Sequence, residues 1–204
     1  MPPRSTPPRA WQRMLSGRRL DLLDPSPLDV EIDDIAHGLA RVARWNGQTH
    51  GDHAFSVAQH CVLVEELALR LEPALDPKFR LVVLLHDGPE YVIGDMISPF
   101  KAVVGGGYKA VEHRLEAAIH IRFGLPATVP EAIRTLTKRA DHVSAYFEAV
   151  ELAGFSAEEA ARLFGRPKGF PERLNLTPWP VGEAQARFLE RFHQLDRLAH
   201  PTDA

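Results

Sequence analysis

The chain has 204 residues, of which 27 are acidic and 24 basic, giving a formal net charge of −3. That length suits one domain with a sizeable core. The slight excess of acidic residues gives no sign of the basic surface that binds duplex nucleic acid. No apolar run approaches the roughly 18 residues of a membrane span, so a cytoplasmic protein with neither a membrane nor a nucleic acid polymer as partner is expected.

The first 27 residues are expected to form an N-terminal arm, and residues 28–204 the domain itself. Four prolines fall within residues 2–8 and no apolar core follows them, which excludes a secretory signal and favours a disordered or surface-lying segment. The single cysteine, Cys61, excludes an internal disulfide. It lies in an apolar helical pattern and is expected to be buried and inert.

Apolar residues at helical spacing predict a series of amphipathic helices. Pro89 should end one of them at the His86-Asp87 pair and begin a short helix that carries Glu90. Ser156 and Glu159 have the spacing of a capping box. No alternating strand pattern or internal repeat is found, so the expected fold class is all-α, a single compact domain. The longer helices are expected over residues 28–39, 55–71, 79–86, 108–123, 131–152, 156–164 and 183–198.

Residues 166–182 hold four prolines and little periodicity, which predicts a long loop that crosses the domain before the last helix. Phe170 and Trp179 are the side chains expected to hold this loop against the core.

The stretch from residue 84 to residue 95 carries the most unusual chemistry. Residues 81–85 are all aliphatic and should carry His86 and Asp87 into the interior. An unpaired charge there costs several kcal/mol unless a partner neutralises it, and a bound metal ion would be such a partner.

Two further residues complete a set of metal-ligand types, namely His60 on the preceding helix and Asp141 on a later one. Two imidazoles with two carboxylates suit a divalent ion such as manganese, iron, cobalt, nickel or zinc. Each residue alone has a plainer explanation. His60 would be a hydrogen-bonded core histidine, and Asp141 would lie on a solvated helix face together with Thr137, Ser144 and Glu148.

This set resembles the H…HD…D signature of the HD superfamily of metal-dependent phosphohydrolases. The resemblance is closest to the small bacterial 5′-deoxynucleotidase branch and runs from about residue 28 to about residue 153. Gln59 stands where the family has an acidic residue, and Gly88-Pro89 follows the His-Asp doublet where small helix formers are commoner. The matching motifs are Arg44-Trp45, Val57-Ala58-Gln59-His60, His86-Asp87-x-x-Glu90-x-x-x-x-Asp95 and Lys138-Arg139-Ala140-Asp141.

The resemblance implies a helical domain built around one divalent ion (Mn, Co, Fe, Ni, Zn or Mg), and a homodimer. Its metal ligands would be His60, His86, Asp87 and Asp141. Glu90 would be the catalytic acid or base, and Asp95 would orient phosphate or sugar hydroxyl groups.

The resemblance also implies the substrate contacts. Arg44 would hold phosphate oxygens and Trp45 would pack against the sugar or base. Lys101 is a candidate second phosphate cation and His53 a candidate substrate contact, although a solvated loop residue explains either one as well.

The expected reaction is hydrolysis of a (deoxy)nucleoside 5′-monophosphate to nucleoside and phosphate by attack of a metal-bound water. One alternative uses the same site to remove triphosphate from deoxynucleoside triphosphates, with the phosphate tail near Lys101, Lys138 or Arg139. Another is a helical metal- or nucleotide-binding protein without turnover, which Arg44, Glu90 and Asp95 beside the ligands disfavour. A purely structural interaction domain leaves the buried His-Asp pair unexplained.

Overall fold

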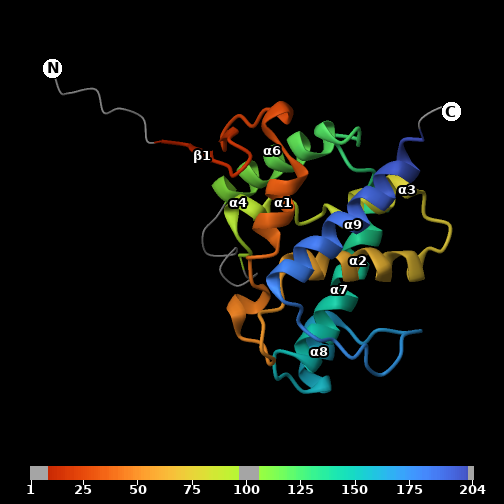
Figure 1. The fold of residues 1–204 in the computed structure, drawn as a ribbon. Helices are drawn as coiled ribbons and strands as arrows, with labels where there is room; N and C mark the ends of the chain where they lie inside the picture. The colour runs from red at the N-terminus through yellow and green to blue at the C-terminus, as the bar shows by residue number, and fades with distance from the viewer. Residues whose placement is uncertain (1–8, 97–105, 202–204) are drawn as a thin grey trace.

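The computed structural model describes residues 9–96 and 106–201, and within them the fold is helical with one small sheet (Figure 1). The expectation of an all-α fold is confirmed. Short 3₁₀ turns at Pro27–Asp29 and Arg44–Gly47 precede α1 and α2. The α-helices are α1 (Ile32–Leu39), α2 (Val57–Leu71), α3 (Pro77–Leu84), α4 (Glu90–Ile93), α6 (Gly106–Arg122), α7 (Glu131–Glu151), α8 (Ala157–Phe164) and α9 (Val181–Ala199).

The expected absence of strands is wrong near the N-terminus. Strands β1 (Trp11–Arg13) and β2 (Arg19–Asp21) pair antiparallel, with Trp11 opposite Asp21. Three-residue strands are too short to show alternation in the sequence. Met14 and Leu20 from this hairpin join the main core, so residues 9–27 of the expected arm pack against the domain. The proline-rich residues 1–8 lie outside the described residues.

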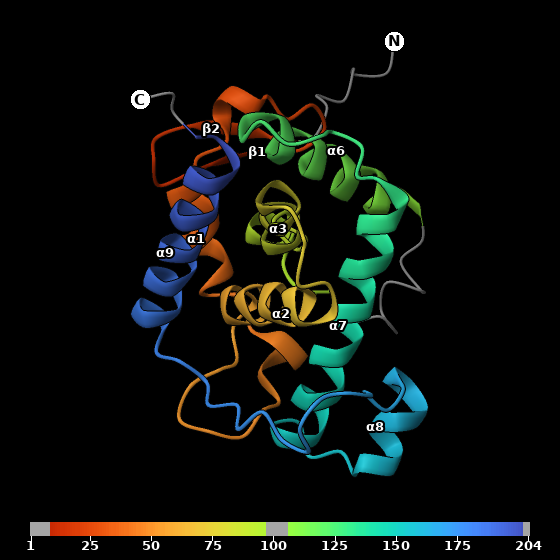
Figure 2. The same cartoon turned by 90° about the vertical axis from the view of Figure 1, so that its right-hand side faces the viewer.

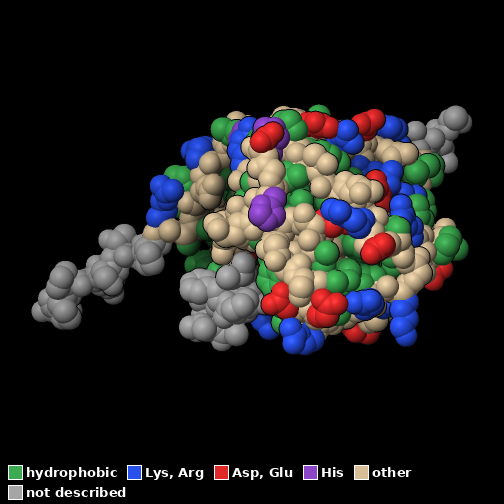
Figure 3. All heavy atoms as spheres, turned by 90° about the horizontal axis from the view of Figure 1, so that it is seen from below, with side chains coloured by type: hydrophobic (Ala, Val, Ile, Leu, Met, Phe, Trp, Pro, Cys, Tyr) green, Lys and Arg blue, Asp and Glu red, His purple; other side chains and the backbone are tan. Residues whose placement is uncertain are grey.

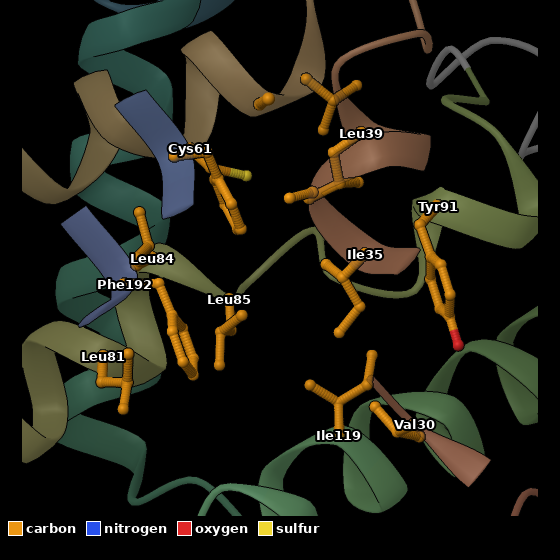
Figure 4. Close-up of a cluster of buried hydrophobic side chains, with 14 of the residues drawn as sticks. Val30, Ile35, Leu39, Cys61, Leu81, Leu84, Leu85, Tyr91, Ile119 and Phe192 are labelled. Atoms are coloured by element: carbon orange, nitrogen blue, oxygen red, sulfur yellow. The ribbon is translucent and has the colours of Figure 1, made fainter. Parts of the chain in front are cut away.

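Helix α2 lies at the centre of the domain. It packs against α3, α7 and α9, and Figure 2 shows it between α7 on one side and α9 with α1 on the other. Its buried face includes Cys61, whose thiol is fully buried as expected, and burial raises the pKa of that thiol. Leu84 and Leu85 lie with Cys61 and Phe192 in one buried cluster, opposite Ile35 and Ile119 of α1 and α6 (Figure 4).

Glu65 is a charged residue that the sequence did not single out. It is fully buried on α2, and its two carboxylate oxygens accept from the Nε atoms of Arg80 and Arg191, each at 2.6 Å. This ion triad ties α2 to α3 and α9, because each arginine comes from one of those helices.

The segment from residue 165 to residue 180 is the predicted crossing loop, and α9 begins at Val181 rather than at residue 183. Phe170 and Trp179 pack against core clusters, as predicted. Two side chains also bind the loop backbone. The Gln59 amide donates to the Thr177 carbonyl at 2.8 Å and accepts from the Trp179 N–H at 2.9 Å. Glu151 accepts from the backbone N–H groups of residues 174 and 176.

The capping box at Ser156 is confirmed, with reciprocal bonds between its own groups and those of Glu159. Among residues 9–96 and 106–201, no helix is both long and apolar enough to cross a bilayer. The face seen in Figure 3 interleaves acidic and basic side chains rather than gathering one sign into a patch.

Candidate metal centre

Three chain segments bring the predicted ligands together around the buried end of α2. His60 lies in the first turn of α2, which Ser56 caps by accepting from the Gln59 N–H. His86 and Asp87 directly follow α3, and Asp141 lies in the middle of α7. Since α2 packs against both α3 and α7, the four side chains meet.

The distances define one compact group. His60 Nε2 lies 3.3 Å from Asp141 Oδ1 and 3.5 Å from Asp87 Oδ2. His86 Nε2 lies 3.3 Å from the same Asp87 oxygen. Ligand atoms of His60, His86 and Asp141 all lie within 4.8 Å of one another, so this group could hold a metal ion.

The hydrogen bonds of the two imidazoles fit a metal ion. His86 Nδ1 donates to the Val83 carbonyl at 2.9 Å, and His60 Nδ1 lies 2.6 Å from Glu148 Oε1. A carbonyl or a carboxylate can only accept, so Nδ1 carries a proton in both rings, and each ring in its neutral form offers the lone pair of Nε2. Among the described residues, neither buried Nε2 atom has a hydrogen-bond partner. A divalent ion would satisfy both.

Electrostatics favour charged forms at this site despite burial. Burial disfavours charge on His86 and Asp87, but their mutual attraction raises the pKa of His86 and lowers the pKa of Asp87. Burial and Arg44 oppose protonation of His60, yet Glu148 and Asp141 raise its pKa overall. The pKa of Asp141 is lowered by His60 against the effect of its own burial. A proton on either imidazole therefore competes with a metal ion for Nε2.

Glu148 was not among the predicted site residues. It and Ser144 were assigned to a face that could be solvated, yet both are fully buried, so that interpretation is wrong for them. Glu148 Oε1 accepts from Ser144 Oγ at 2.7 Å as well as from His60. Burial opposes its ionisation, but Arg44 and His60 lower the pKa of its carboxyl group. The spacing of Asp141, Ser144 and Glu148 (i, i+3, i+7) was the available signal.

The Arg44-Trp45 motif lies beside this carboxylate. Arg44 Nε lies 3.2 Å from Glu148 Oε2, and the Trp45 indole N–H donates to the same oxygen at 2.8 Å. Trp45 and Asn46 both adopt the left-handed region, with φ of 57° and 51°. The indole ring packs against Phe155 and Phe164, at centroid distances of 5.7 and 5.9 Å. The expected contact of Trp45 with a sugar or base stays a prediction.

Arg44 is surrounded by carboxylates. Its Nη1 lies 3.7 Å from Asp95 Oδ2, in addition to the contact with Glu148. Burial opposes its charge, but Glu148, Asp87, Asp141 and Asp95 together hold its pKa above the ordinary value. The guanidinium is therefore fixed as a cation next to the candidate metal ligands.

Glu90 is the first residue of α4, one turn beyond the His86-Asp87 doublet, and it is 3 % exposed.

Gly88, where the HD resemblance leads one to expect a small helix former, is a glycine for a steric reason. A Cβ at Gly88 would lie 2.8 Å from the Leu85 carbonyl oxygen and 3.2 Å from Ile119 Cδ1. Only glycine fits there without displacing the backbone that carries His86 and Asp87.

Of the remaining predicted substrate contacts, the structure describes His53, Lys138 and Arg139. His53 is exposed, and no described contact joins it to the four ligands. Lys101 lies outside the described residues. Lys138 and Arg139 are exposed on α7. Arg139 lines a groove of about 280 Å³ with residues 164–168. Two residues along a helix turn the side chain by about 200°, so Arg139 lies on nearly the opposite side of α7 from Asp141.

A larger groove, of about 670 Å³, lies between α2, α9 and residues 174–179. Its lining includes Gln59 but none of the four ligands. We place the candidate site at the histidine-aspartate group rather than in that groove, because among the described residues the metal-binding atoms converge at His60, His86 and Asp141.

Comparison with known proteins finds relatives across most of the chain, although no family model matches it. An uncharacterized protein of Rhodobacter capsulatus is 58 % identical over 194 residues, which cover 93 % of this chain and 97 % of the relative. The uncharacterized protein YfdR of Escherichia coli is 32 % identical over 170 residues, covering 83 % of this chain and 86 % of YfdR.

Proposed function

We propose that this chain, which belongs to the same family as the Rhodobacter capsulatus and Escherichia coli proteins, is a metal-dependent phosphohydrolase of the HD type. Its substrate is a (deoxy)nucleoside 5′-monophosphate, which it cleaves to nucleoside and phosphate. The observation that carries the proposal is the pair of imidazoles, His60 and His86, whose buried Nε2 atoms lack a described hydrogen-bond partner and lie within 3.5 Å of Asp87 or Asp141 oxygens.

His60, His86, Asp87 and Asp141 would hold one divalent ion. Such an ion lowers the pKa of a water molecule that it binds and supplies a hydroxide nucleophile near neutral pH, which attack on a phosphate ester needs.

Arg44 binds the phosphate group in this proposal. Glu148 occupies its Nε and Asp95 lies near Nη1, which leaves the outer N–H groups of the guanidinium for phosphate oxygens. Charge-assisted hydrogen bonds of this kind are about twice as strong as neutral ones. Four surrounding carboxylates keep Arg44 charged and would repel an anion that did not also contact the metal ion. Phosphate is thereby selected at the position between Arg44 and the metal ligands.

Glu90 and Asp95 carry the remaining roles. Glu90 is a buried carboxyl group one turn from the ligand doublet, where it would orient the attacking water or protonate the leaving 5′ oxygen. Asp95 lies beside Arg44, where it would keep the guanidinium in place and accept from a sugar hydroxyl. A homodimer and a cytoplasmic location stay predictions that accompany this function.

The triphosphate alternative needs cations beyond Arg44 for a longer phosphate tail. Of its candidate cations on α7, Arg139 lies on nearly the opposite side from Asp141, whereas Lys138, three residues before Asp141, lies on the same side. A non-catalytic metal- or nucleotide-binding protein uses the same ligands and differs only in the absence of turnover.

The test is to incubate metal-stripped protein with Mn²⁺, Co²⁺, Ni²⁺, Zn²⁺ or Mg²⁺ and a panel of nucleoside mono- and triphosphates. Phosphate and tripolyphosphate are separated among the products. We expect phosphate from 5′-monophosphates with at least one ion. Release of tripolyphosphate would favour the triphosphohydrolase alternative. The absence of turnover with every combination of metal ion and nucleotide would show that the protein is not a nucleotide phosphohydrolase. Arg139→Ala is the control that should leave monophosphate hydrolysis unchanged.

A further inference from the structure

We propose that Glu148 is a positioning residue that both sets the metal-binding tautomer of His60 and aims Arg44 at the phosphate. The inference rests on the proposed function and deepens it, because it makes one buried carboxylate responsible for two parts of the site. Neither the sequence motif nor the relatives assign a role to this residue.

The geometry accounts for all the acceptor positions of Glu148. A carboxylate offers about four lone-pair positions. Oε1 accepts from His60 Nδ1 at 2.6 Å and from Ser144 Oγ at 2.7 Å. Oε2 accepts from Trp45 Nε1 at 2.8 Å and from Arg44 Nε at 3.2 Å. The carboxylate is fully buried, so protein donors take the place of water on both oxygens.

The contact through Oε1 controls metal binding. Because Glu148 can only accept, His60 must donate from Nδ1, and this leaves the lone pair of Nε2 facing Asp87 and Asp141. A carboxylate behind a metal-bound histidine fixes the tautomer and the orientation of the ring.

The contact through Oε2 controls phosphate binding. Holding Arg44 by Nε fixes the plane of the guanidinium and leaves its outer edge available. The bond from Trp45 fixes a turn whose Trp45 and Asn46 residues adopt left-handed conformations, which persist only where the surroundings determine them. Glu148 thus links the candidate metal ligands on α2 and α7, His60 and Asp141, to the turn that presents Arg44.

Substitution by glutamine tests this role with almost no change in shape. An amide has an acceptor on one end only, so one of the two donor pairs must then face an NH₂ group. Arg44 and Trp45 can only donate, whereas neutral His60 can move its proton from Nδ1 to Nε2. The amide oxygen should therefore face Arg44 and Trp45. The NH₂ group should face His60 and place a proton on the atom that binds the metal.

The experiment compares wild-type protein with Glu148→Gln by calorimetric titration of Mn²⁺ and by nitrogen NMR of the imidazoles in the metal-free state at alkaline pH. We expect Mn²⁺ affinity to fall about 10- to 100-fold. The His60 signals should change from the Nδ1-protonated to the Nε2-protonated tautomer, and KM for the nucleotide at saturating metal should change little. Unchanged Mn²⁺ affinity together with an unchanged tautomer would overturn the inference.

The matched control is Glu65→Gln, which alters another fully buried glutamate with two arginine partners. It should lower the thermal stability but leave Mn²⁺ affinity and the His60 tautomer as in wild type. Equal loss of Mn²⁺ affinity in both variants would mean that general destabilisation, not positioning, is the cause. Wild-type protein that binds Mn²⁺ but hydrolyses no nucleotide would refute the proposed function alone, because the tautomer remains measurable without turnover.

Discussion

Gln59→Glu introduces the acidic residue that the resemblance to the HD superfamily implies at this position, and the structure predicts that it destabilises this protein. The Gln59 amide donates to the Thr177 carbonyl at 2.8 Å and accepts from the Trp179 N–H at 2.9 Å, and the side chain is 5 % exposed. A carboxylate can keep only the second bond. Its other oxygen would face the Thr177 carbonyl oxygen, which would lose its hydrogen bond.

The magnitude follows from the lost donor. A buried acceptor left without its partner costs about 1–3 kcal/mol, so we expect about 2 kcal/mol of unfolding free energy to be lost at neutral pH. For a domain of this size, each kcal/mol lowers Tm by about 2–4 °C, which gives a decrease of about 4–8 °C. Mn²⁺ affinity should change little, because His60 keeps its own contacts with Glu148.

The pH dependence provides a second readout. Burial and the Thr177 carbonyl should raise the pKa of the new carboxyl group above its unfolded value of about 4.3. The destabilisation is therefore absent below that unfolded value and grows until the pH passes the raised folded pKa. Urea unfolding at pH 5 and pH 8 measures the destabilisation. Gln185→Glu is the control, because the described hydrogen bond of the Gln185 side chain is one that its oxygen accepts from Arg41, and a carboxylate can keep that bond. Equal stability of wild type and Gln59→Glu at pH 8 would show that the Gln59–Thr177 hydrogen bond contributes nothing to stability.

Three further predictions concern the metal centre. Asp87→Ala should abolish both metal retention and turnover. Glu90→Ala should retain the metal and lower kcat by about 10²- to 10⁴-fold. Equal loss of metal in the two variants would show that Glu90 is a metal ligand rather than the catalytic acid or base. Metal affinity should still rise as the pH increases above about 6.5, because the raised pKa values of His60 and His86 keep protons on Nε2 at that pH. Calorimetry in buffers of different ionisation enthalpy should detect the protons that are released when the metal binds. Gly88→Ala should lose about 1–3 kcal/mol of stability, because its Cβ meets the Leu85 carbonyl oxygen and Ile119; an unchanged unfolding midpoint contradicts this.

The helices could be predicted because they depend on local patterns, and the four candidate ligands were expected to meet because their segments were expected to pack together. The apolar seams of α2 and α7 place His60 and Asp141 on helices that pack together, and the aliphatic run of α3 carries His86 inward. Periodicity fixes which face of a helix is buried, but Asp141 lies off the apolar seam, so its place in the set depended on the combination of ligand-type residues and on the resemblance to the HD signature.

The surroundings of the ligands could not be predicted in this way. Glu148 belongs to a polar helix face, and its burial depends on α2 packing against α7 and on the turn at Arg44 and Trp45. The role of Gln59 depends on a loop more than a hundred residues later in the chain. The hairpin at the N-terminus was missed because three-residue strands carry too little pattern.

If His60 Nε2 and His86 Nε2 bind one ion, anomalous scattering from crystals grown with Mn²⁺ will locate it directly. We expect one strong anomalous peak per chain within bonding distance of both nitrogens and of oxygens from Asp87 and Asp141. A well-ordered site without such a peak, or a peak bound only by surface carboxylates, would show that these histidines do not bind a metal ion.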